Sequence, residues 1–363
     1  MKSEVTYIFS GGRSSKTNNN YANDFFYGYR ELKNIGYNVK FIELESTKTN
    51  ILDKIIIKIF KLPIYSTKAL RYKNFKLMKN SKNLVLINES SFSSFLLFTL
   101  VTKYLYKVNV IYFPMGLIDK YKNGNFFTKL YIKFSFIPAS KILFIGKGEL
   151  KSAKKLIDVH KNKYEYIPFS IDTNFWKFNK KVDNDGKHVL FIGNDKNRDF
   201  NLLYKIAEKE THLKFTIISE FKSIDFNKLP NVNLISGNWR EGNLTDLELM
   251  KYYHQANLVI LPLLDSSQPS GQSVCLQAMA CGTPVIISKT LGFWEDRNYI
   301  NKKNIYFIKN SNIDNWCNTI NVLLSNKFAL EEVSINARKL IENEHNTEKF
   351  VKLLKNQLLA ISL

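Results

Sequence analysis

Segment 256–292 holds the side chains of this chain that are best placed for chemistry. An apolar run that ends at Pro262 opens into a loop of small residues, and a helix is expected to begin within 270–273. The free N–H groups at a helix start can hold an anion, and Gly271 lets a ligand approach the backbone. One turn further, Gln277 can present an amide to sugar hydroxyls. The pattern fits an anion site, and it fits equally an ordinary strand–loop–helix with a serine cap.

Strand–helix alternation, repeated twice, supplies the elements that must position this loop. Short continuous apolar runs are typical of buried parallel strands, and they predict strands at 5–9, 39–44, 84–87, 110–113 and 141–145, then at 188–192, 214–219, 232–236, 258–262, 284–288 and 305–308. Helices are expected at 21–33, 149–157, 200–209, 247–255, 273–281, 312–325, 330–342 and 348–361.

The fold class that follows is α/β, with two Rossmann-like doubly wound domains facing a cleft. Residues 166–186 are polar and rich in turn formers, which favours a linker. We therefore expect an N-terminal domain over 1–170, a C-terminal domain over 171–345, and a helix over 346–363 that could pack back on the N-terminal domain. Ligands in such folds lie at the carboxyl ends of the strands, so the cleft is the expected site.

Three motifs in order carry a resemblance to a known family. Residues 256–292 resemble the donor-binding signature of retaining glycosyltransferases of the GT-B fold, specifically glycosyltransferase family 4, because 277–286 read QAMACGTPVI. Residues 166–176, YIPFSIDTNFW, resemble the interdomain segment of that family, and 189–198 resemble its first nucleotide-domain strand and phosphate-side loop. The resemblance covers about residues 140–345 and implies a nucleoside-diphosphate sugar as donor, retention of configuration and no metal.

The chain departs from the family pattern at several positions. Pro269 stands at the first signature glutamate and Gln277 at the second, which usually contacts the donor ribose. Arg198 keeps the charge of the usual lysine, whereas Asn194 replaces a common arginine. Many relatives carry a cleft histidine in the N-terminal domain, but no histidine precedes His160 here, and 113–116 (FPMG) occupy the place expected for it.

The resemblance, and for Glu89 and 239–240 their positions just after strands, assign roles to individual residues. The expected donor-binding residues are Gly11, Gly12, Asn194, Arg198, Trp239, Arg240, Ser270, Gly271, Gln272, Ser273, Val274 and Gln277. The expected catalytic residues are Arg198, which would meet the charge of the leaving diphosphate, and Glu89, an acid just past strand 84–87. Each of the weaker candidates also has a purely structural interpretation. The glycines at 11–12 could serve only a tight turn after the strand, 239–240 could be a surface loop, and Glu89 could make a structural hydrogen bond.

Charge is concentrated in the N-terminal half. The net charge is +21, from 53 Lys plus Arg against 32 Asp plus Glu, and residues 1–180 contribute about +19 of it. Residues 51–65 predict an amphipathic helix with Lys54, Lys58 and Lys61 on one face beside an isoleucine stripe. Such a helix can lie in an anionic membrane surface, or it can bury its stripe in its own domain. No nucleic-acid-binding signature accompanies the charge.

These observations predict a glycosyltransferase that moves a sugar from a nucleoside-diphosphate sugar to a glycan or lipid-linked glycan acceptor in bacterial surface polysaccharide synthesis. We expect it to be cytoplasmic and peripheral on the inner face of the cell membrane, with no cofactor and no metal. Only three cysteines occur, which argues against a disulfide scaffold. Two alternatives remain open, a catalytically weak glycosyltransferase-like binding or scaffold protein and a nucleotide-sugar epimerase of the same fold.

Overall fold

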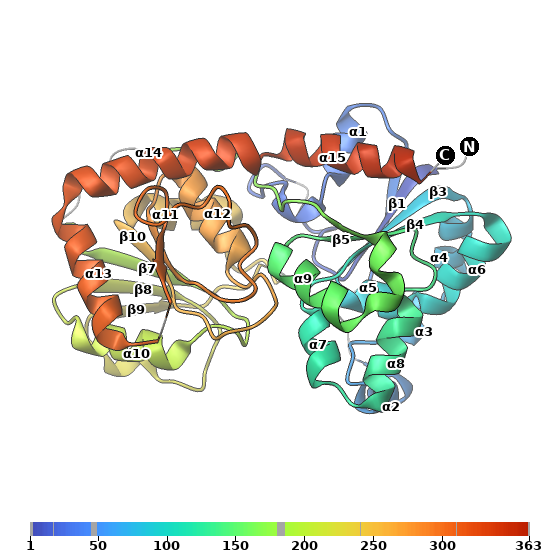
Figure 1. The fold of residues 1–363 in the computed structure, drawn as a ribbon, viewed down its shortest axis with the longest axis horizontal. Coiled ribbons are helices and arrows are strands. Elements are labelled where there is room, and N and C mark those ends of the chain that lie inside the picture. The colour runs from blue at the N-terminus through green and yellow to red at the C-terminus, as the bar shows by residue number, and fades with distance from the viewer. Residues whose placement is uncertain are drawn as a thin grey trace.

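The computed structural model describes residues 3–16, 18–44, 49–179, 186–239, 241–309 and 311–361. Two sheets of six parallel strands form the centres of two domains (Figure 1). The strand order is β2-β1-β3-β4-β5-β6 in the N-terminal sheet and β12-β11-β10-β7-β8-β9 in the C-terminal sheet. The expected fold class, two Rossmann-like doubly wound domains, is confirmed.

The N-terminal sheet is built from runs of apolar residues that are buried on both faces, as parallel strands flanked by helices must be. Its strands are β1 (Ser3–Phe9), β2 (Val39–Glu43), β3 (Ser81–Ile87), β4 (Asn109–Phe113), β5 (Lys141–Phe144) and β6 (Tyr164–Tyr166). The edge strand β6 is not among the strands that the sequence predicts, and its last residue, Tyr166, is the first residue of the range that favours a linker. Its pairing with β5 extends the first domain's sheet.

The C-terminal sheet has its topological switch between β7 and β10, where the strand order reverses. Its strands are β7 (His188–Ile192), β8 (Lys214–Ile218), β9 (Val232–Ile235), β10 (Leu258–Leu261), β11 (Val285–Ser288) and β12 (Tyr306–Ile308). The turn after β7 and the loop after β10 therefore meet at the carboxyl edge of the sheet, which is where open α/β folds bind their ligands.

Helices cover both sheets. The N-terminal domain has α1 (Tyr29–Asn34), α2 (Ile51–Phe60), α3 (Ser66–Ala69), α4 (Tyr72–Lys79), α5 (Glu89–Ser94), α6 (Leu96–Tyr106), α7 (Leu117–Asn123), α8 (Phe126–Ser135) and α9 (Lys147–Leu156). The rest of the chain has α10 (Phe200–Lys209), α11 (Asp246–Gln255), α12 (Gln272–Cys281), α13 (Ile313–Ser325), α14 (Lys327–Glu344) and α15 (Thr347–Ala360). None of the helices in the described ranges is long and apolar enough to cross a membrane.

The helix expected over 21–33 is wrong for its first half. A short 3-10 turn, Asp24–Phe26, is followed by two residues in the left-handed region, Tyr27 (φ 49°) and Gly28 (φ 80°), and α1 begins only after them. A β-carbon on Gly28 would lie 3.2 Å from a methyl group of Val351 on α15. The glycine therefore both turns the chain and lets the last helix pack closely on this corner.

Helices α14 and α15 run in sequence along one side of the molecule and carry the chain end from the C-terminal domain back to the first (Figure 1). On α15, the ring of Phe350 packs 6.1 Å from that of Phe113 in β4 and 6.5 Å from that of Tyr27. Gln357 donates a hydrogen bond of 2.9 Å to the carboxylate of Glu165. One cluster of buried apolar residues runs through both domains, so the two sheets share a core across their interface.

Candidate active site at the domain interface

Arg198 lies at the switch point of the C-terminal sheet, in the turn that follows β7. Its backbone forms an isolated bridge to Leu263, which follows β10, and its side chain is buried at 5% exposure. A β-carbon on Gly193 would lie 2.1 Å from the Arg198 Nε atom, and one on Gly271 would lie 3.0 Å from Nη1. Both glycines are needed because a side chain at either position would displace the guanidinium.

The guanidinium of Arg198 has hydrogen-bonding capacity to spare. Its Nε and Nη1 atoms are buried and find no hydrogen-bond partner within the described chain, and Nη2 lies 3.5 Å from a carboxylate oxygen of Asp195. Burial lowers the pKa of Arg198, and the nearby Asp195 acts in the opposite direction. A buried cation with two unpartnered donor nitrogens is costly unless an anion completes it, so the site is arranged to bind one.

The start of α12 adjoins this guanidinium. Gly271 caps the helix in the left-handed conformation (φ 76°), and the amides of the first turn have no acceptors inside their own helix. The Ser270 hydroxyl accepts a hydrogen bond of 2.8 Å from Asn197. The Gln272 side chain donates to the Ile145 carbonyl of the first domain, at 3.0 Å, while its own oxygen is buried without a partner in the described residues. Ser273 is half-buried and Val274 is buried.

Beside the arginine, a cavity of about 510 Å³ opens along the carboxyl ends of β10, β11 and β12. The cavity is lined by Asp199, which follows Arg198 in sequence, and by Leu263, which forms the backbone bridge to Arg198. Ser288 and Lys289 complete this part of the lining. None of the expected donor-binding residues that the structure describes lines this cavity itself, but it adjoins Arg198 through Asp199 and Leu263 and is large enough for part of a nucleotide sugar.

Gln277 is buried, and protein groups use both ends of its amide. Its Nε2 atom donates to the Asp24 carboxylate at 2.9 Å, and its Oε1 atom accepts from the Tyr253 hydroxyl at 3.1 Å. The sequence predicts that this amide contacts sugar hydroxyls. In the structure it instead joins the C-terminal domain to the 3-10 turn of the first domain, and donor contact remains a prediction.

Asp24 is a central residue of the interface that the sequence analysis missed. Its carboxylate also accepts from the Asp172 amide, at 2.7 Å, and from the Trp176 indole, at 2.7 Å. Burial raises the pKa of Asp24 to about 8, although its hydrogen bonds oppose the shift. No local signal marks an isolated aspartate in a turn, because its partners are about 150 and 250 residues away in sequence.

Trp239 lies at the same interface, on the side of the first domain's glycine loop. The Arg13 guanidinium lies 5.3 Å above its ring, the Lys16 ammonium 4.7 Å above it, and the Phe25 ring 4.9 Å from it. Its indole N–H donates a hydrogen bond of 3.4 Å to Asp246. Trp239 is thus a bridge between domains. Its predicted neighbour in the site, the arginine at position 240, lies outside the described residues.

The glycine loop after β1 is held by its own domain. Gly11 (φ 143°) and Gly12 (φ 83°) both adopt backbone conformations that favour glycine. The Glu43 carboxylate, at the end of β2, accepts hydrogen bonds from the amides of Arg13 and Ser14, the latter at 3.0 Å. The tight strand exit is therefore present, and the approach of a donor phosphate to the loop remains a prediction.

Two other predicted residues have partners within their own domains. The Asn194 side chain donates to the Gly237 carbonyl at 2.6 Å and accepts from the Glu220 amide at 2.7 Å, so it ties together the loops after β7, β8 and β9. Glu89, at the start of α5, forms an ion pair with Lys120 of α7. A positioning role fits both side chains, and a catalytic role for Glu89 remains a prediction.

A second contact that the sequence did not indicate joins α7 to the donor-side loop. The Asp119 carboxylate accepts hydrogen bonds from the amides of Ser267, at 3.1 Å, and Gln268, at 3.3 Å. A β-carbon on Gly116 would overlap the Gln268 side chain, at 2.4 Å. The FPMG segment that replaces the expected histidine thus lies directly against the loop that leads into α12. Among the described residues, no three His, Cys, Asp or Glu side chains gather closely enough to hold a metal ion.

Comparisons with known proteins agree with this geometry. Residues 186–326 match the family model described as Glycosyl transferases group 1. A search of curated proteins finds no sequence that matches the chain. Among solved structures, sucrose-phosphate synthase from Thermosynechococcus elongatus superimposes with a TM-score of 0.73 at 14% identity, over 98% of this chain and 99% of that one.

Two further structures share the whole fold. HepE from Anabaena, solved with UDP and glucose, gives a TM-score of 0.70 at 11% identity, over 98% of this chain and 99% of that one. The catalytic domain of starch synthase IV from Arabidopsis thaliana, bound to ADP and acarbose, gives 0.67 at 12% identity, with both chains covered completely. At these identities the likeness establishes the fold, which is that of GT-B glycosyltransferases.

Proposed function

Because residues 186–326 form a Glycosyl transferases group 1 domain within a GT-B fold, we propose that this chain transfers a sugar from a nucleoside-diphosphate sugar to a lipid-linked glycan, with retention of configuration. The observation that carries the proposal is the buried Arg198 guanidinium, whose Nε and Nη1 atoms have no partner in the described chain. A nucleotide sugar would bring a diphosphate, which is the anion that such a fork recognises.

The chemistry follows from what the diphosphate requires. As the bond between sugar and diphosphate breaks, negative charge grows on the departing oxygen, and preorganised donors in a dry site stabilise it strongly. Arg198 and the first-turn amides of α12 would supply these donors, so we propose that no metal is needed. With no carboxylate base assigned, the departing phosphate oxygen would take the acceptor proton on the same face of the sugar, which gives retention.

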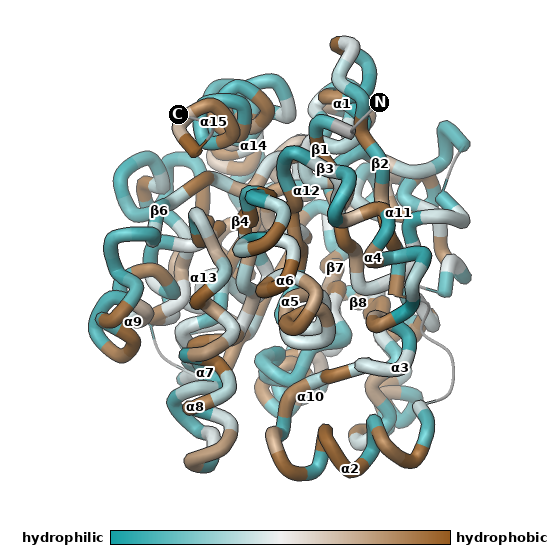
Figure 2. The backbone as a smooth tube through the Cα atoms, turned by 90° about the vertical axis from the view of Figure 1, so that its right-hand side faces the viewer, coloured by the Kyte–Doolittle hydropathy of each residue, from teal (hydrophilic) through white to brown (hydrophobic). Residues whose placement is uncertain are grey.

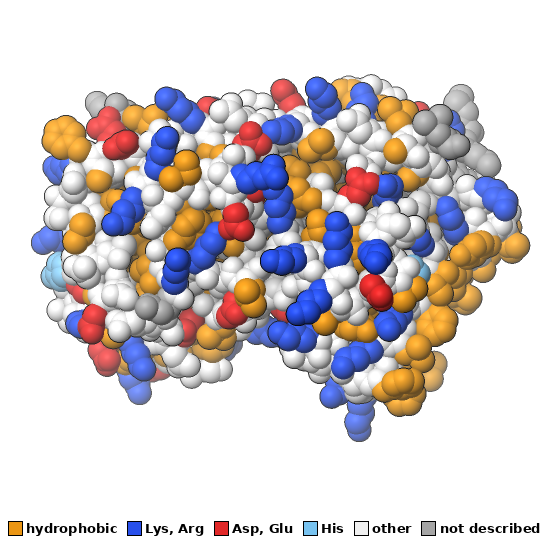
Figure 3. All heavy atoms as spheres, in the orientation of Figure 1, with side chains coloured by type: hydrophobic (Ala, Val, Ile, Leu, Met, Phe, Trp, Pro, Cys, Tyr) orange, Lys and Arg blue, Asp and Glu red, His pale blue; other side chains and the backbone are white. Residues whose placement is uncertain are grey.

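The membrane part of the proposal is supported by two adjacent helices of the first domain. Ile51 is 76% exposed on α2 and Phe126 is 72% exposed on α8. The large apolar side chains exposed on these helices are Ile51, Leu52, Ile55 and Ile59 on α2, and Phe126, Phe127, Leu130 and Phe134 on α8. Figure 2 shows the apolar α2 at one end of the molecule, and Figure 3 shows apolar side chains gathered along the outer edge of this domain.

These two helices form one surface rather than two. The Asn125 side chain, at the start of α8, donates a hydrogen bond of 3.1 Å to the Ile59 carbonyl of α2. The predicted contact residues Lys54, Lys58 and Lys61 are all exposed beside the isoleucines. Exposed aliphatic and aromatic side chains flanked by lysines favour docking on an anionic bilayer, with apolar insertion and charge attraction acting together. We propose that this surface holds the enzyme at the inner face of the cell membrane.

A panel of nucleotide sugars tests the proposal. Thermal unfolding of the wild type with UDP, GDP, ADP and CMP sugars should show stabilisation by at least one of them, and an Arg198→Gln variant should lose it. Transfer of the sugar from that donor to a lipid-linked acceptor then tests the reaction. If no nucleotide sugar stabilises the wild type, the proposed donor site is refuted.

One observation favours a second candidate, a glycosyltransferase-like binding protein. Pro269 and Gln277 replace both signature glutamates, and the amide of Gln277 is already bound by Asp24 and Tyr253. A protein of this kind would keep nucleotide binding and show neither donor hydrolysis nor transfer. The same thermal-unfolding panel followed by a transfer assay separates the two candidates.

A further inference from the structure

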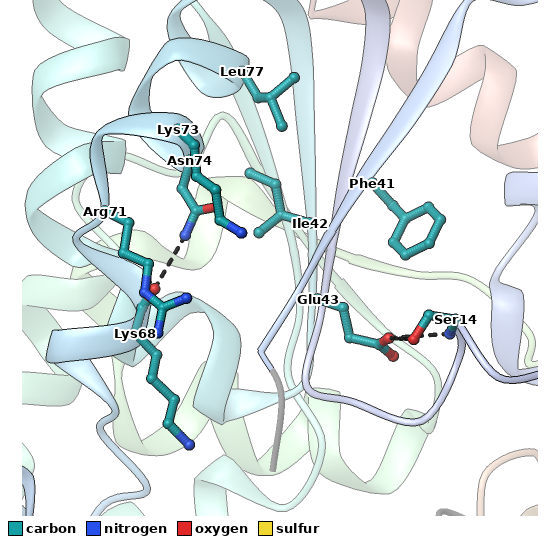
Figure 4. Close-up of a pocket in the computed structure, with 9 residues that line it drawn as sticks. All are labelled: Ser14, Phe41, Ile42, Glu43, Lys68, Arg71, Lys73, Asn74 and Leu77. Carbon is teal, nitrogen blue, oxygen red and sulfur yellow. Dashed lines mark hydrogen bonds between the residues drawn. The ribbon is translucent and has the colours of Figure 1, made fainter. Parts of the chain in front are cut away.

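A second pocket, of about 240 Å³, opens in the first domain beside the carboxyl end of β2 (Figure 4). Its apolar part is made by Phe41 and Ile42 of β2 and Leu77 of α4. Its polar lining residues are Ser14, Glu43, Lys68, Arg71, Lys73 and Asn74. Ser14 belongs to the loop that follows β1, so this pocket lies on the far side of the glycine loop from the donor domain.

The charges around this pocket are unbalanced. Arg71 and Lys73 are exposed, and neither forms an ion pair within the described chain. The one acid among the described lining residues is Glu43, whose carboxylate already accepts hydrogen bonds from two loop amides and from the Ser14 hydroxyl. Glu43 is thus committed to the loop, and Arg71 and Lys73 have no ion-pair partner among the described residues.

The wall that carries the cations is fixed in place. The Asn74 side chain is buried and donates hydrogen bonds to the carbonyls of Lys68, at 3.1 Å, and Ala69, at 3.0 Å, which fastens the turn between α3 and α4 (Figure 4). On the other side of α3, the buried Asp53 of α2 accepts from the hydroxyls of Ser66, at 2.8 Å, and Thr67, at 2.7 Å. The pocket is therefore connected directly to the helix that we place on the membrane.

We propose that this pocket binds a phosphate group of the acceptor, the one that joins the glycan to its lipid. The guanidinium of Arg71 and the ammonium of Lys73 lie on the same wall of a small cavity, and together they match the charge of a phosphate. The pocket lies between the surface of α2 that faces the bilayer and the loop that borders the transfer site. A lipid-linked acceptor with its lipid in the bilayer and its glycan at the transfer site would place its phosphate between these two, at the pocket. The acceptor role rests on the proposed glycosyl transfer.

The test uses two charge-matched double variants of the full chain. Arg71→Gln with Lys73→Gln removes the two cations of the pocket. Lys76→Gln with Lys82→Gln removes the same charge from exposed positions outside its lining. Binding of glycerol 3-phosphate, followed by titration calorimetry, should weaken at least tenfold in the pocket variant and by less than twofold in the control. An equal loss in both variants, or no saturable binding to the wild type, would overturn the proposal.

A second arm distinguishes the source of the phosphate. Flotation with vesicles of phosphatidylglycerol should fall equally in the two double variants if the pocket receives an acceptor phosphate, because both lose the same charge. A larger fall in the pocket variant would assign the site to bilayer headgroups and overturn the acceptor role. Nucleotide-sugar stabilisation is measured on the same samples. Its absence from the wild type would refute the proposed transfer, and with it the acceptor role, even where glycerol 3-phosphate still binds.

Discussion

Replacing Asp24 by asparagine tests how the two domains are held together. The Asp24 carboxylate is buried and accepts three hydrogen bonds, from the Asp172 amide, the Trp176 indole and the Gln277 amide. An asparagine has nearly the same shape, but one of its two polar atoms is a donor. In the better of its two orientations that donor faces the Asp172 amide, so one hydrogen bond is lost and two N–H groups oppose each other. At about pH 8 and above, where Asp24 is ionised, such a loss costs about 1–3 kcal/mol in the free energy of unfolding.

The pH dependence gives the sharper magnitude. Burial raises the pKa of Asp24 from 3.8 to about 8, so the folded protein retains a proton that the unfolded chain releases. For an acid with a raised pKa, the contribution to stability is fully present below the unfolded pKa and is lost as the pH rises to the folded pKa. Each pH unit inside this window changes the free energy of unfolding by about 1.4 kcal/mol. From about pH 5.5 to 8 the wild type should therefore lose about 3 kcal/mol through this group.

Chemical denaturation of both proteins across this pH range measures the effect. Subtracting the free energy of unfolding of Asp24→Asn from that of the wild type cancels the contributions of other buried acids. One of these is Asp246, whose pKa is raised by burial to about 6. This difference should narrow by about 3 kcal/mol between pH 5.5 and 8. Asp158→Asn, which alters an exposed carboxylate, serves as the matched control. Parallel profiles for wild type and Asp24→Asn would refute the reasoning, because they would mean that Asp24 does not titrate in this window.

Three further predictions follow from the site and the membrane surface. Arg198→Ala should raise the free energy of the transition state by about 2–4 kcal/mol and so lower kcat/KM for the donor sugar. Unchanged steady-state turnover would contradict the role of this residue. Changing Lys54, Lys58 and Lys61 to glutamate should abolish flotation on anionic vesicles, and equal recovery on neutral and anionic vesicles by the wild type would rule out the electrostatic part. Gln277→Glu should destabilise the protein more than Gln277→Ala does, because a carboxylate would replace the amide donor that binds Asp24. A higher unfolding temperature for Gln277→Glu than for Gln277→Ala would contradict this.

The parts of the site that sequence alone could predict are those encoded locally. An apolar strand, a loop of small residues with Gly271 and a helix start are consecutive in the chain, and so are β7, Gly193 and Arg198. The folded structure brings these two segments to the switch point between β7 and β10, where open α/β sheets bind their ligands. The alternation of strands and helices predicts a ligand site at the carboxyl ends of the strands, but not which strands are neighbours.

The parts that could not be predicted depend on the docking of the two domains. The amide of Gln277 was assigned to a ligand because its partner, Asp24, is about 250 residues away and has no motif around it. The apolar face of α8 was also missed, because Phe126, Phe127, Leu130 and Phe134 would suit a buried helix equally well in sequence. The break at Gly28 reflects the close approach of α15, a contact that no local propensity contains.

The two halves of the chain meet negative charge in physically different ways. In the proposed function the donor domain would bind the diphosphate through one buried cation, Arg198, whose Nε and Nη1 atoms are buried without a partner in the described chain. Outside the pocket beside β2, the first domain carries many exposed cations, each of which attracts an anion weakly because solvent and salt screen it. A buried arginine selects one ligand of fixed geometry, whereas a field of exposed lysines attracts a whole surface without fixing its orientation. On our proposal, the excess of about +19 in residues 1–180 would hold the chain at a bilayer, and the single arginine would serve the transfer.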